Sequence, residues 1–418
     1  MLRQFSCTNF RNIQVENMEL GRINLLIGPN NAGKSNLIRA LSFCGNMISA
    51  GTSETTGFLS EVQRNGFSEM LKKGGKNSEI RMGWQIALKD QNVNYTLSFD
   101  TGKDQKDFRV TNESLDSVES LPECDHPFNF FRCHQEQAGT GRFSTALKMG
   151  QKNKRATAEV SQYETVLLQF DKLVIQNQEL LEQPYIRETI FTMLEELRAY
   201  LRRFYSYSSS GFDFSAIRQL CSPQSDGAVL KKDGSNLVNL YERLCTEDKA
   251  FAKRFKQKMK SLIPDLTDIR VVKGLDKIGM QLVRQQGKFL LSEVSDGTIE
   301  ALLLALLFSM PPGDSPSLLA IDEPEVNLHP AWQKLFARWV QTSGNIAQCF
   351  ISTHSPDFLD EFTEGFLGGK VNLYVYDPIG KNSFRALDRE RMEEALEGGW
   401  FLGDLYRVND PAIGGWPW

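Results

Sequence analysis

The chain has 418 residues, of which 41% are hydrophobic and 24% charged, the composition of an ordinary globular protein. Its net charge of -4 at pH 7 excludes a surface that is basic all over, although a local basic stripe remains compatible with nucleic-acid binding. The seven cysteines show no CxxC spacing and no signal peptide precedes them, so free thiols in the cytoplasm are expected. No apolar run reaches the roughly 18 residues that a membrane span needs, so no membrane partner is expected.

The predicted elements begin with strands. The first 20 residues alternate loosely between apolar and polar, which predicts a strand pair, and residues 22–28 form a compact apolar strand that ends in glycine. A glycine-rich loop follows, and the residues after it are apolar at helical spacing. Residues 80–99 predict two further strands joined by a polar turn. The segment from about 100 to 155 is mixed and turn-rich, and its pattern supports no assignment.

The middle of the chain favours helices. Residues 162–181 and 186–204 predict two amphipathic helices interrupted by Pro184. Neither shows the sustained heptads that a long coiled-coil arm would need. Residues 234–264 also predict helix, and residues 271–291 predict two strands.

The C-terminal part alternates strands with helices. The turn SDGT at 295–298 opens a strongly apolar helix, and three strand-like runs follow, with a helix at 329–343 between the first two. We therefore expect an α/β fold with a mixed, largely parallel sheet built from both ends of the chain. The expected parts are an N-terminal half of the head (1–100), a mixed and helical insertion lobe (101–235) and a C-terminal half (236–418).

Residues 28–35, GPNNAGKS, match the phosphate-loop pattern G-x-x-x-x-G-K-[ST] in full, after a strand and at the opening of a helix. The glycines let backbone N–H groups turn toward phosphates, and the helix N-terminus adds partial positive charge. A glycine turn that matches by chance is the alternative, and this context disfavours it. The predicted nucleotide-binding residues here are Gly28, Pro29, Asn30, Asn31, Ala32, Gly33, Lys34, Ser35 and Asn36, with Lys34 on the outer phosphates and Ser35 on Mg²⁺.

A second motif places acids at the end of an apolar run, LLAIDEPE, which predicts a buried parallel strand whose carboxyl end opens onto a site. Beside a phosphate loop, Asp322 is expected to hold Mg²⁺ directly or through water, and Glu323 to polarise the attacking water. The alternative is that both acids only cap the helix after Pro324. Glu325 suits capping or a supporting contact at least as well as chemistry.

Two further motifs flank these acids. The helix that SDGT opens offers free N–H groups to an anion, although the turn alone would be an ordinary N-cap. SDGT begins 27 residues before Asp322, and His354 lies 32 residues after it, at the end of a strand, where an imidazole is placed to contact a γ-phosphate.

GPNNAGKS, SDGT, LLAIDEPE and STHSP, in this order, resemble the motifs of the ABC-type ATPases of the RecF, SMC and OLD group. More closely, NFRNI, LKKDGSNL, DEPEVNLHP, THSPDFLD and FLGDLYRVNDPAIGG resemble AAA-type ATPases of the OLD-like, RecF-like branch found in bacterial phage-defence and DNA-maintenance systems. The resemblance covers nearly the whole chain and is weakest from about 100 to 225. It implies an ABC-ATPase-like head with a helical insertion lobe.

The resemblance also implies roles for single residues. Lys34, Glu323 and His354 match the phosphate-loop lysine, the general base and the switch histidine, while Ser35 and Asp322 match the Mg²⁺ ligands. Ser295, Asp296 and Gly297 match the signature motif, which in this family acts across a dimer on the partner's γ-phosphate. Arg11, in NFRNI, matches a basic residue near the nucleotide. Two features depart from the pattern: the signature reads SDGT where transporters have a Ser-Gly-Gly core, and Gln63 and Gln85 are only weak candidates for a lid glutamine.

The resemblance implies a cytoplasmic, Mg²⁺-dependent ATPase in which two or more identical chains sandwich ATP. OLD nucleases continue into a nuclease domain where this sequence ends, so we expect a nuclease or toxin effector in a separate chain, controlled in phage defence. The alternative is a repair or chromosome-maintenance ATPase that acts directly on DNA. A basic segment, with Lys249, Lys253, Arg254, Lys256, Lys258 and Lys260, bears on this choice, since it suits either a phosphate contact or a solvated helix face.

Overall fold

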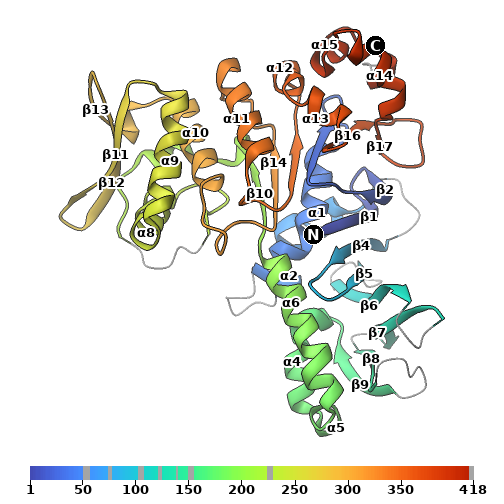
Figure 1. Ribbon diagram of the computed structural model, residues 1–418. Helices are drawn as coiled ribbons and strands as arrows, with labels where there is room; N and C mark the ends of the chain where they lie inside the picture. Colours follow the sequence, from blue (N-terminus) through green and yellow to red (C-terminus); the bar gives the residue numbers. More distant parts are fainter. Residues whose placement is uncertain are drawn as a thin grey trace. The chain divides into compact units, whose positions relative to one another are not determined.

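The structure is a computed structural model that describes residues 1–49, 57–73, 78–101, 108–120, 125–137, 140–148, 155–223 and 229–413 (Figure 1). The chain forms two compact units, each assembled from separate segments. We call the first, Met1–Gly21, Asn30–Tyr205 and Tyr376–Arg385, the antiparallel unit, and the second, Arg22–Pro29, Ser206–Val375 and Ala386–Trp418, the parallel unit.

The antiparallel unit is built on an eight-stranded sheet with the order β2-β1-β4-β5-β6-β7-β8-β9. Its adjacent strands pair antiparallel throughout. The strands are β1 (Leu2–Phe10), β2 (Ile13–Glu19), β4 (Ile80–Ala87), β5 (Asn92–Thr101), β6 (Phe108–Ser120), β7 (Pro127–Gln137), β8 (Thr140–Ala146) and β9 (Arg155–Ser161). In β4 the buried Ile80, Met82, Trp84 and Ile86 alternate with side chains of the other face, so the sheet has one apolar face.

Helices cover this apolar face. The helices of the unit are α1 (Lys34–Ser49), α2 (Gly57–Asn65), α3 (Phe67–Met70), α4 (Val166–Gln176), α5 (Gln178–Leu181) and α6 (Phe191–Arg202), the last preceded by a π-helical turn (Ile186–Ile190). Phe43 of α1 stacks on Phe99 of β5, and Phe170 of α4 meets Phe143 of β8 edge to face. Such aromatic pairs bury large areas, so they fix the helices to the sheet.

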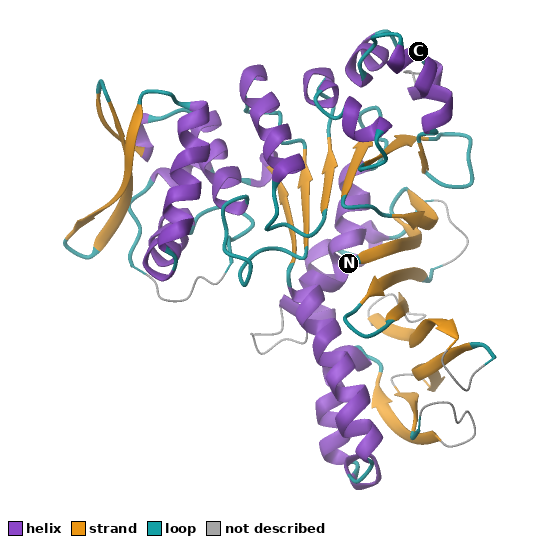
Figure 2. Cartoon of the chain, viewed as in Figure 1, coloured by secondary structure: helices purple, strands orange, loops and turns teal. Residues whose placement is uncertain are grey.

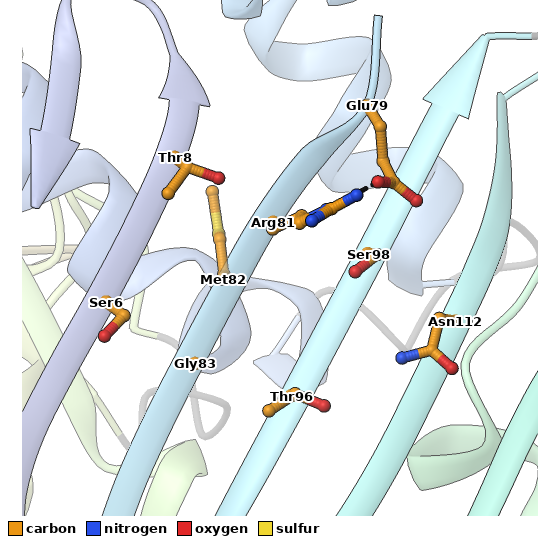
Figure 3. A pocket seen from close by; sticks show the side chains of 9 residues that line it. All are labelled: Ser6, Thr8, Glu79, Arg81, Met82, Gly83, Thr96, Ser98 and Asn112. Carbon is orange, nitrogen blue, oxygen red and sulfur yellow. Dashed lines mark hydrogen bonds and ion pairs between the residues drawn. The ribbon is translucent and has the colours of Figure 1, made fainter. Parts of the chain in front are cut away.

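The opposite face of the sheet carries mostly polar side chains. Figure 3 shows a shallow hollow of about 480 Å³ on this face, crossed by β1, β4, β5 and β6. Its lining residues are Ser6, Thr8, Glu79, Arg81, Met82, Gly83, Thr96, Ser98 and Asn112. The charges there are already paired, since Arg81 Nε lies 2.5 Å from Glu79 Oε2.

The second large sheet has six strands in the order β10-β14-β15-β3-β16-β17, and β14, β15 and β3 at its centre belong to the parallel unit. The strands are β10 (Phe204–Ser208), β14 (Leu318–Asp322), β15 (Cys349–Ser352), β3 (Ile23–Ile27), β16 (Val371–Tyr376) and β17 (Phe384–Ala386). The four strands β14, β15, β3 and β16 pair parallel with one another in this order, and their arrows point the same way in Figure 2. Every residue of β14, β15 and β3 is buried, as expected for central strands of such a sheet.

Helices and a small sheet complete the parallel unit. The helices are α7 (Phe214–Arg218), α8 (Leu237–Glu247), α9 (Lys249–Leu262), α10 (Asp296–Leu307), α11 (Pro330–Thr342), α12 (Pro356–Asp360), α13 (Thr363–Leu367), α14 (Arg389–Glu397) and α15 (Leu402–Arg407), with 3-10 turns at Ser209–Gly211, Leu291–Glu293 and Pro411–Ile413. A three-stranded sheet contains β11 (Leu266–Gly274), β12 (Lys277–Arg284) and β13 (Gly287–Leu290). Among the described residues, no helix is long and apolar enough to cross a membrane.

The predicted fold class is confirmed: a largely parallel sheet built from both ends of the chain, antiparallel N-terminal strands, and helices. The strands differ from the prediction in several places, since β10 and β17 were not predicted. The unassigned segment after residue 100 contributes β6 to β9, whose outward polar side chains conceal the alternation, and residues 266–290 form three strands where two were predicted. The division at residues 101 and 236 stays a prediction.

Candidate nucleotide-binding site

The phosphate loop links β3 to α1, as predicted. β3 ends at Ile27 and α1 begins at Lys34. The backbone φ is +66° at Asn31 and +100° at Gly33. Positive φ values of this kind are adopted most readily by glycine and, among the other residues, by asparagine. A Cβ at Gly33 would also lie 2.6 Å from Asn12 Oδ1, so only glycine fits there. Lys34 and Ala32 are buried.

Side chains of the antiparallel unit fasten this loop to the β1–β2 turn. Asn12 Nδ2 donates to the Asn31 carbonyl at 3.2 Å, and Asn36 Nδ2 donates to Asn12 Oδ1 at 2.9 Å. Arg11 Nη1 donates to Asn36 Oδ1 at 3.2 Å, and burial lowers the pKa of the Arg11 guanidinium. The structure thus places Arg11 beside the loop, in contact with Asn36. A contact of Arg11 with the nucleotide stays a prediction.

In the parallel unit, the start of the loop and Asp322 lie at one sheet edge. Asp322 pairs with Ser352, and Ser352 with Leu26, in the register of β14, β15 and β3. Because Gly28 follows Leu26 by two residues, the loop leaves the sheet at the carboxyl edge that carries Asp322. Ser352 Oγ donates to Asp322 Oδ1 at 2.5 Å, and Asp322 is only 9% exposed. A carboxylate oxygen is a ligand that Mg²⁺ prefers, so Asp322 fits the predicted metal, and the part of Ser35 stays a prediction.

Glu323 is held in a strained conformation beside His354. Its φ is +52°, in the left-handed region that glutamate seldom occupies. Its N–H donates to the Ser352 carbonyl at 3.1 Å, which fixes the turn, and its Oε1 lies 3.2 Å from His354 Nε2. Helix α11 begins at Pro330 with His329 as its N-cap, so the next helix is not capped by Asp322 or Glu323. The capping alternative is therefore wrong for both acids.

Glu325 makes the supporting contacts that were left open. Its Oε1 accepts from Thr353 Oγ1 at 2.9 Å and from the His354 N–H at 2.5 Å. Burial raises the pKa of this carboxyl, and its Oε2 is buried without a hydrogen-bond partner. Glu325 therefore holds the turn that carries His354.

The signature residues open helix α10. Ser295 is its N-cap, with Oγ accepting from the Thr298 N–H at 3.3 Å. Arg218 Nη2 donates to Asp296 Oδ1 at 2.5 Å. A Cβ at Gly297 would lie 2.4 Å from the Asn327 carbonyl oxygen, so the first turn of α10 packs directly on the loop after β14. The N-cap reading is confirmed, and the action of these residues on a partner's γ-phosphate stays a prediction.

The sequence patterns did not indicate three further candidates: Arg218, Glu300 and Asn327. Glu300 Oε2 accepts from Asn327 Nδ2 at 2.7 Å, which joins α10 to the same loop. One signal was present in the sequence, because Glu300 is the single charged residue in the run TIEALLLALLF. Asn327 carried no such signal, since its partner lies 27 residues away.

The weak lid candidates lie on other elements of the antiparallel unit. Gln85 is on β4, where it lines a second polar hollow that adjoins the one in Figure 3, and Gln63 is exposed on α2. The hollow in Figure 3 contains none of the predicted site residues. It is therefore not the nucleotide site.

A phosphate loop after β3 of a parallel sheet, with Asp322 and Glu323 at the carboxyl end of β14 two strands away, defines a P-loop ATPase. The chain belongs to the family described as "AAA domain, putative AbiEii toxin, Type IV TA system", whose model matches residues 23–165 and 226–360. None of the curated proteins matches this chain.

Among solved structures, the chain is similar to the SMC head bound to the C-terminal winged-helix domain of ScpA. The identity is 12%, the match covers 94% of this chain and 99% of that one, and the TM-score is 0.53, so this likeness shows the fold alone. The SMC head with an extended coiled coil bound to the C-terminal domain of ScpA from Pyrococcus furiosus matches at 12% identity over 95% and 98% of the two chains, with a TM-score of 0.45. The SMC head domain from Thermotoga maritima matches at 11% over 93% and 99%, with a TM-score of 0.39.

Proposed function

We propose that this protein is a Mg²⁺-dependent ATPase that hydrolyses ATP at the phosphate loop, with Glu323 as the general base. The observation that carries the proposal is the Glu323–His354 pair at the carboxyl edge where the loop leaves the sheet. Glu323 Oε1 lies 3.2 Å from His354 Nε2, and the left-handed backbone at Glu323 turns it away from the strand direction of Asp322. A base with an orienting partner is the arrangement that activates a nucleophile.

The chain's own residues then divide the work. The backbone N–H groups of Gly28–Ser35 and Lys34 bind the phosphates, and Asp322 and Ser35 hold Mg²⁺, which supplies charge neutralisation between the outer phosphates when bound. Glu323 accepts a proton from the attacking water. His354 donates to Glu323 or contacts the γ-phosphate, and the Glu325 carboxylate keeps its backbone in place.

We further propose that two chains close around ATP and thereby control an effector encoded separately. Ser295 and Asp296 are exposed at the start of α10, so a second chain can reach them. The description of the family names a putative toxin and a Type IV TA system, which supports a link to a toxin. This gating role, in defence against phage, is the part that needs a partner to test.

The test is to measure ATP binding, ATP hydrolysis and molecular mass in three proteins. Glu323→Gln should bind Mg-ATP normally, lose hydrolysis by roughly a hundredfold or more and accumulate as an ATP-bound dimer. Lys34→Ala should lose binding itself. Equal hydrolysis in Glu323→Gln and the unsubstituted protein would remove Glu323 from its role.

The second part of the test repeats the mass measurement with the neighbouring gene coexpressed. A nucleotide-dependent assembly that carries the neighbour's product supports the gating proposal. A monomer that ignores ATP contradicts it and leaves only the ATP site.

Direct action on DNA is the second candidate, and the basic segment in α9 motivates it. Several cations of this segment already interact within the protein. Arg254 donates a hydrogen bond to Asp248, and Lys256 donates one to Asp268 at 2.9 Å. The Lys258 ammonium lies 5.2 Å from the Trp339 ring centroid. Fewer free cations remain for phosphates, which favours the solvated-face reading. A steep loss of DNA affinity with salt that Lys249→Ala and Lys253→Ala together reduce would support this candidate instead.

A further inference from the structure

A polar network in the parallel unit connects the N-terminus of α10 to the turn that carries His354. Its first contact is the hydrogen bond from Asn327 Nδ2 to Glu300 Oε2, 2.7 Å long. Glu300 is fully buried, and its other oxygen accepts from Ser209 Oγ. Buried hydrogen bonds to a carboxylate are among the stronger ones in proteins, so this contact ties the loop after β14 to the middle of α10.

The main chain strengthens this contact. The Asn327 carbonyl lies where a side chain at Gly297 would be, 2.4 Å from an ideal Cβ. Asn327 thus touches α10 twice, through its carbonyl at the first turn and through its amide at Glu300. A displacement of the first turn of α10 toward the loop would therefore push against the Asn327 carbonyl.

Glu325, two residues before Asn327 in the same loop, links the loop to the turn that carries His354. Glu325 Oε1 accepts from Thr353 Oγ1 and from the His354 N–H, at 2.9 and 2.5 Å. Gln333 holds the other side of the loop: its Nε2 donates to the Leu328 carbonyl at 2.9 Å, and its Oε1 accepts from Ser355 Oγ at 2.6 Å. Thr353, His354 and Ser355 are consecutive, so each step leads to the same turn.

We propose that Glu300 and Asn327 are positioning residues, which transmit the state of the α10 N-terminus to His354 and through it to Glu323. Their role in hydrolysis rests on the ATPase function proposed above, whereas the mechanical connection does not. A ligand or partner chain that engages Ser295 and Asp296 would then act on the hydrolytic pair without touching it.

The chemistry of Glu300 supports this role over simple packing. A buried carboxylate without a cation costs stability, and an apolar residue would pack the same helix at lower cost. The charged groups that act on Glu300 are Glu325 and Asp296, both acidic, and its hydrogen-bond donors are neutral. The Glu300 carboxylate provides two hydrogen-bond acceptor atoms at this place. Glutamine would provide one of them, and alanine would provide none.

The experiment measures amide hydrogen exchange at His354 and steady-state ATP hydrolysis in the full chain. Asn327→Ala should speed exchange of the His354 amide by roughly tenfold, because its acceptor Glu325 loses support. It should lower kcat by roughly tenfold with KM within about twofold, since Lys34 and the loop are untouched. Glu300→Ala should match Asn327→Ala, the double variant should be no worse than either single one, and Glu300→Gln should stay within about twofold of the unsubstituted protein.

A matched control separates transmission from general destabilisation. Gln341 is another amide of the parallel unit with one hydrogen bond to a carbonyl, from Nε2 to Glu361 O at 2.8 Å. Gln341→Ala should leave the His354 amide and kcat unchanged. If Glu300→Ala does not fold, Asn327→Ala alone decides.

Two results would overturn the proposal: His354 exchange in Asn327→Ala equal to that in Gln341→Ala, or effects of Glu300→Ala and Asn327→Ala on that exchange that add in full. If the unsubstituted protein hydrolyses no ATP, the ATPase function fails instead, and the exchange measurement still tests the connection.

Discussion

Among the residues that the structure describes, each unit buries one glutamate completely, Glu113 in β6 and Glu300 in α10. Burial raises the pKa of both carboxyls to about 7. Their partners differ. Glu113 accepts from the main-chain N–H groups of Val166 and Leu167, at 2.6 and 2.9 Å, and from Tyr95 Oη at 3.0 Å.

Glu113 therefore caps helix α4 from a strand. Thr165, the residue at the N-cap of α4, makes no side-chain cap hydrogen bond, so the glutamate replaces it. Glu300 leaves the capping of α10 to Ser295 and bonds side chains of two other segments. The same acid with the same burial thus caps a helix in one unit and joins α10 to two other segments in the other.

The largest effect is expected from Glu113→Ala. It would leave two helix N–H groups and the Tyr95 hydroxyl without their acceptor, so the free energy of unfolding should fall by about 4 kcal/mol. Urea unfolding measures it. Glu159→Ala, at an exposed position of β9 in the same sheet, should stay within about 0.5 kcal/mol and is the control. A loss as small as that of Glu159→Ala would contradict the capping role.

The next effect is the pH dependence that both glutamates impose. A carboxyl whose pKa is raised from 4.5 to about 7 on folding binds its proton more tightly in the folded state. Its stabilising contribution is therefore complete below pH 4.5, declines as the pH rises and is lost above about 7. The shift corresponds to at most about 3 kcal/mol for each group.

Glutamine at the two positions should separate the two roles. Glu300→Gln can still accept from Asn327 and donate to Ser209, so it should be more stable than the unsubstituted protein at pH 8 and less stable at pH 5. Glu113→Gln turns a donor toward a helix N–H and should be less stable at both. Unfolding at pH 5 and pH 8 checks this, and identical behaviour of the two variants would remove the distinction.

The sequence predicted the fold class and the strand ends that carry the phosphate loop, Asp322 and His354, because these lie within short local patterns. It did not predict Glu113, which caps a helix 53 residues later in the chain, or the partner of Asn327. Hydrogen bonds between residues far apart in the chain produce no local sequence pattern from which they could be predicted. The strands after residue 100 were missed for a related reason, since polar side chains on their outer face weaken the apolar signal.

A smaller effect is expected from Gly297→Ala, which tests the contact of α10 with Asn327. The added Cβ would lie 2.4 Å from a backbone oxygen, which cannot rotate away, so stability should fall by about 2 kcal/mol and ATP hydrolysis with it. Gly313→Ala is the matched control in the same unit, because a Cβ there would meet nothing within 4 Å. Thermal unfolding and kcat, measured on both variants, test this contact. Tolerance of alanine at both positions would mean that α10 and the loop move apart freely.

The smallest effects are expected at the N-termini of α10 and α4, which can be compared directly. Ser295 Oγ accepts from the Thr298 N–H, so Ser295→Ala should cost about 1 kcal/mol, the usual value for a lost N-cap. Thr165 Oγ1 has only a weak contact, 3.9 Å from Met47 Sδ, so Thr165→Val should change the free energy of unfolding by less than about 0.5 kcal/mol. Chemical denaturation resolves this difference. The reverse order would show that Thr165, and not Glu113, holds the start of α4, and the contrast between the two buried glutamates would then have to be redrawn.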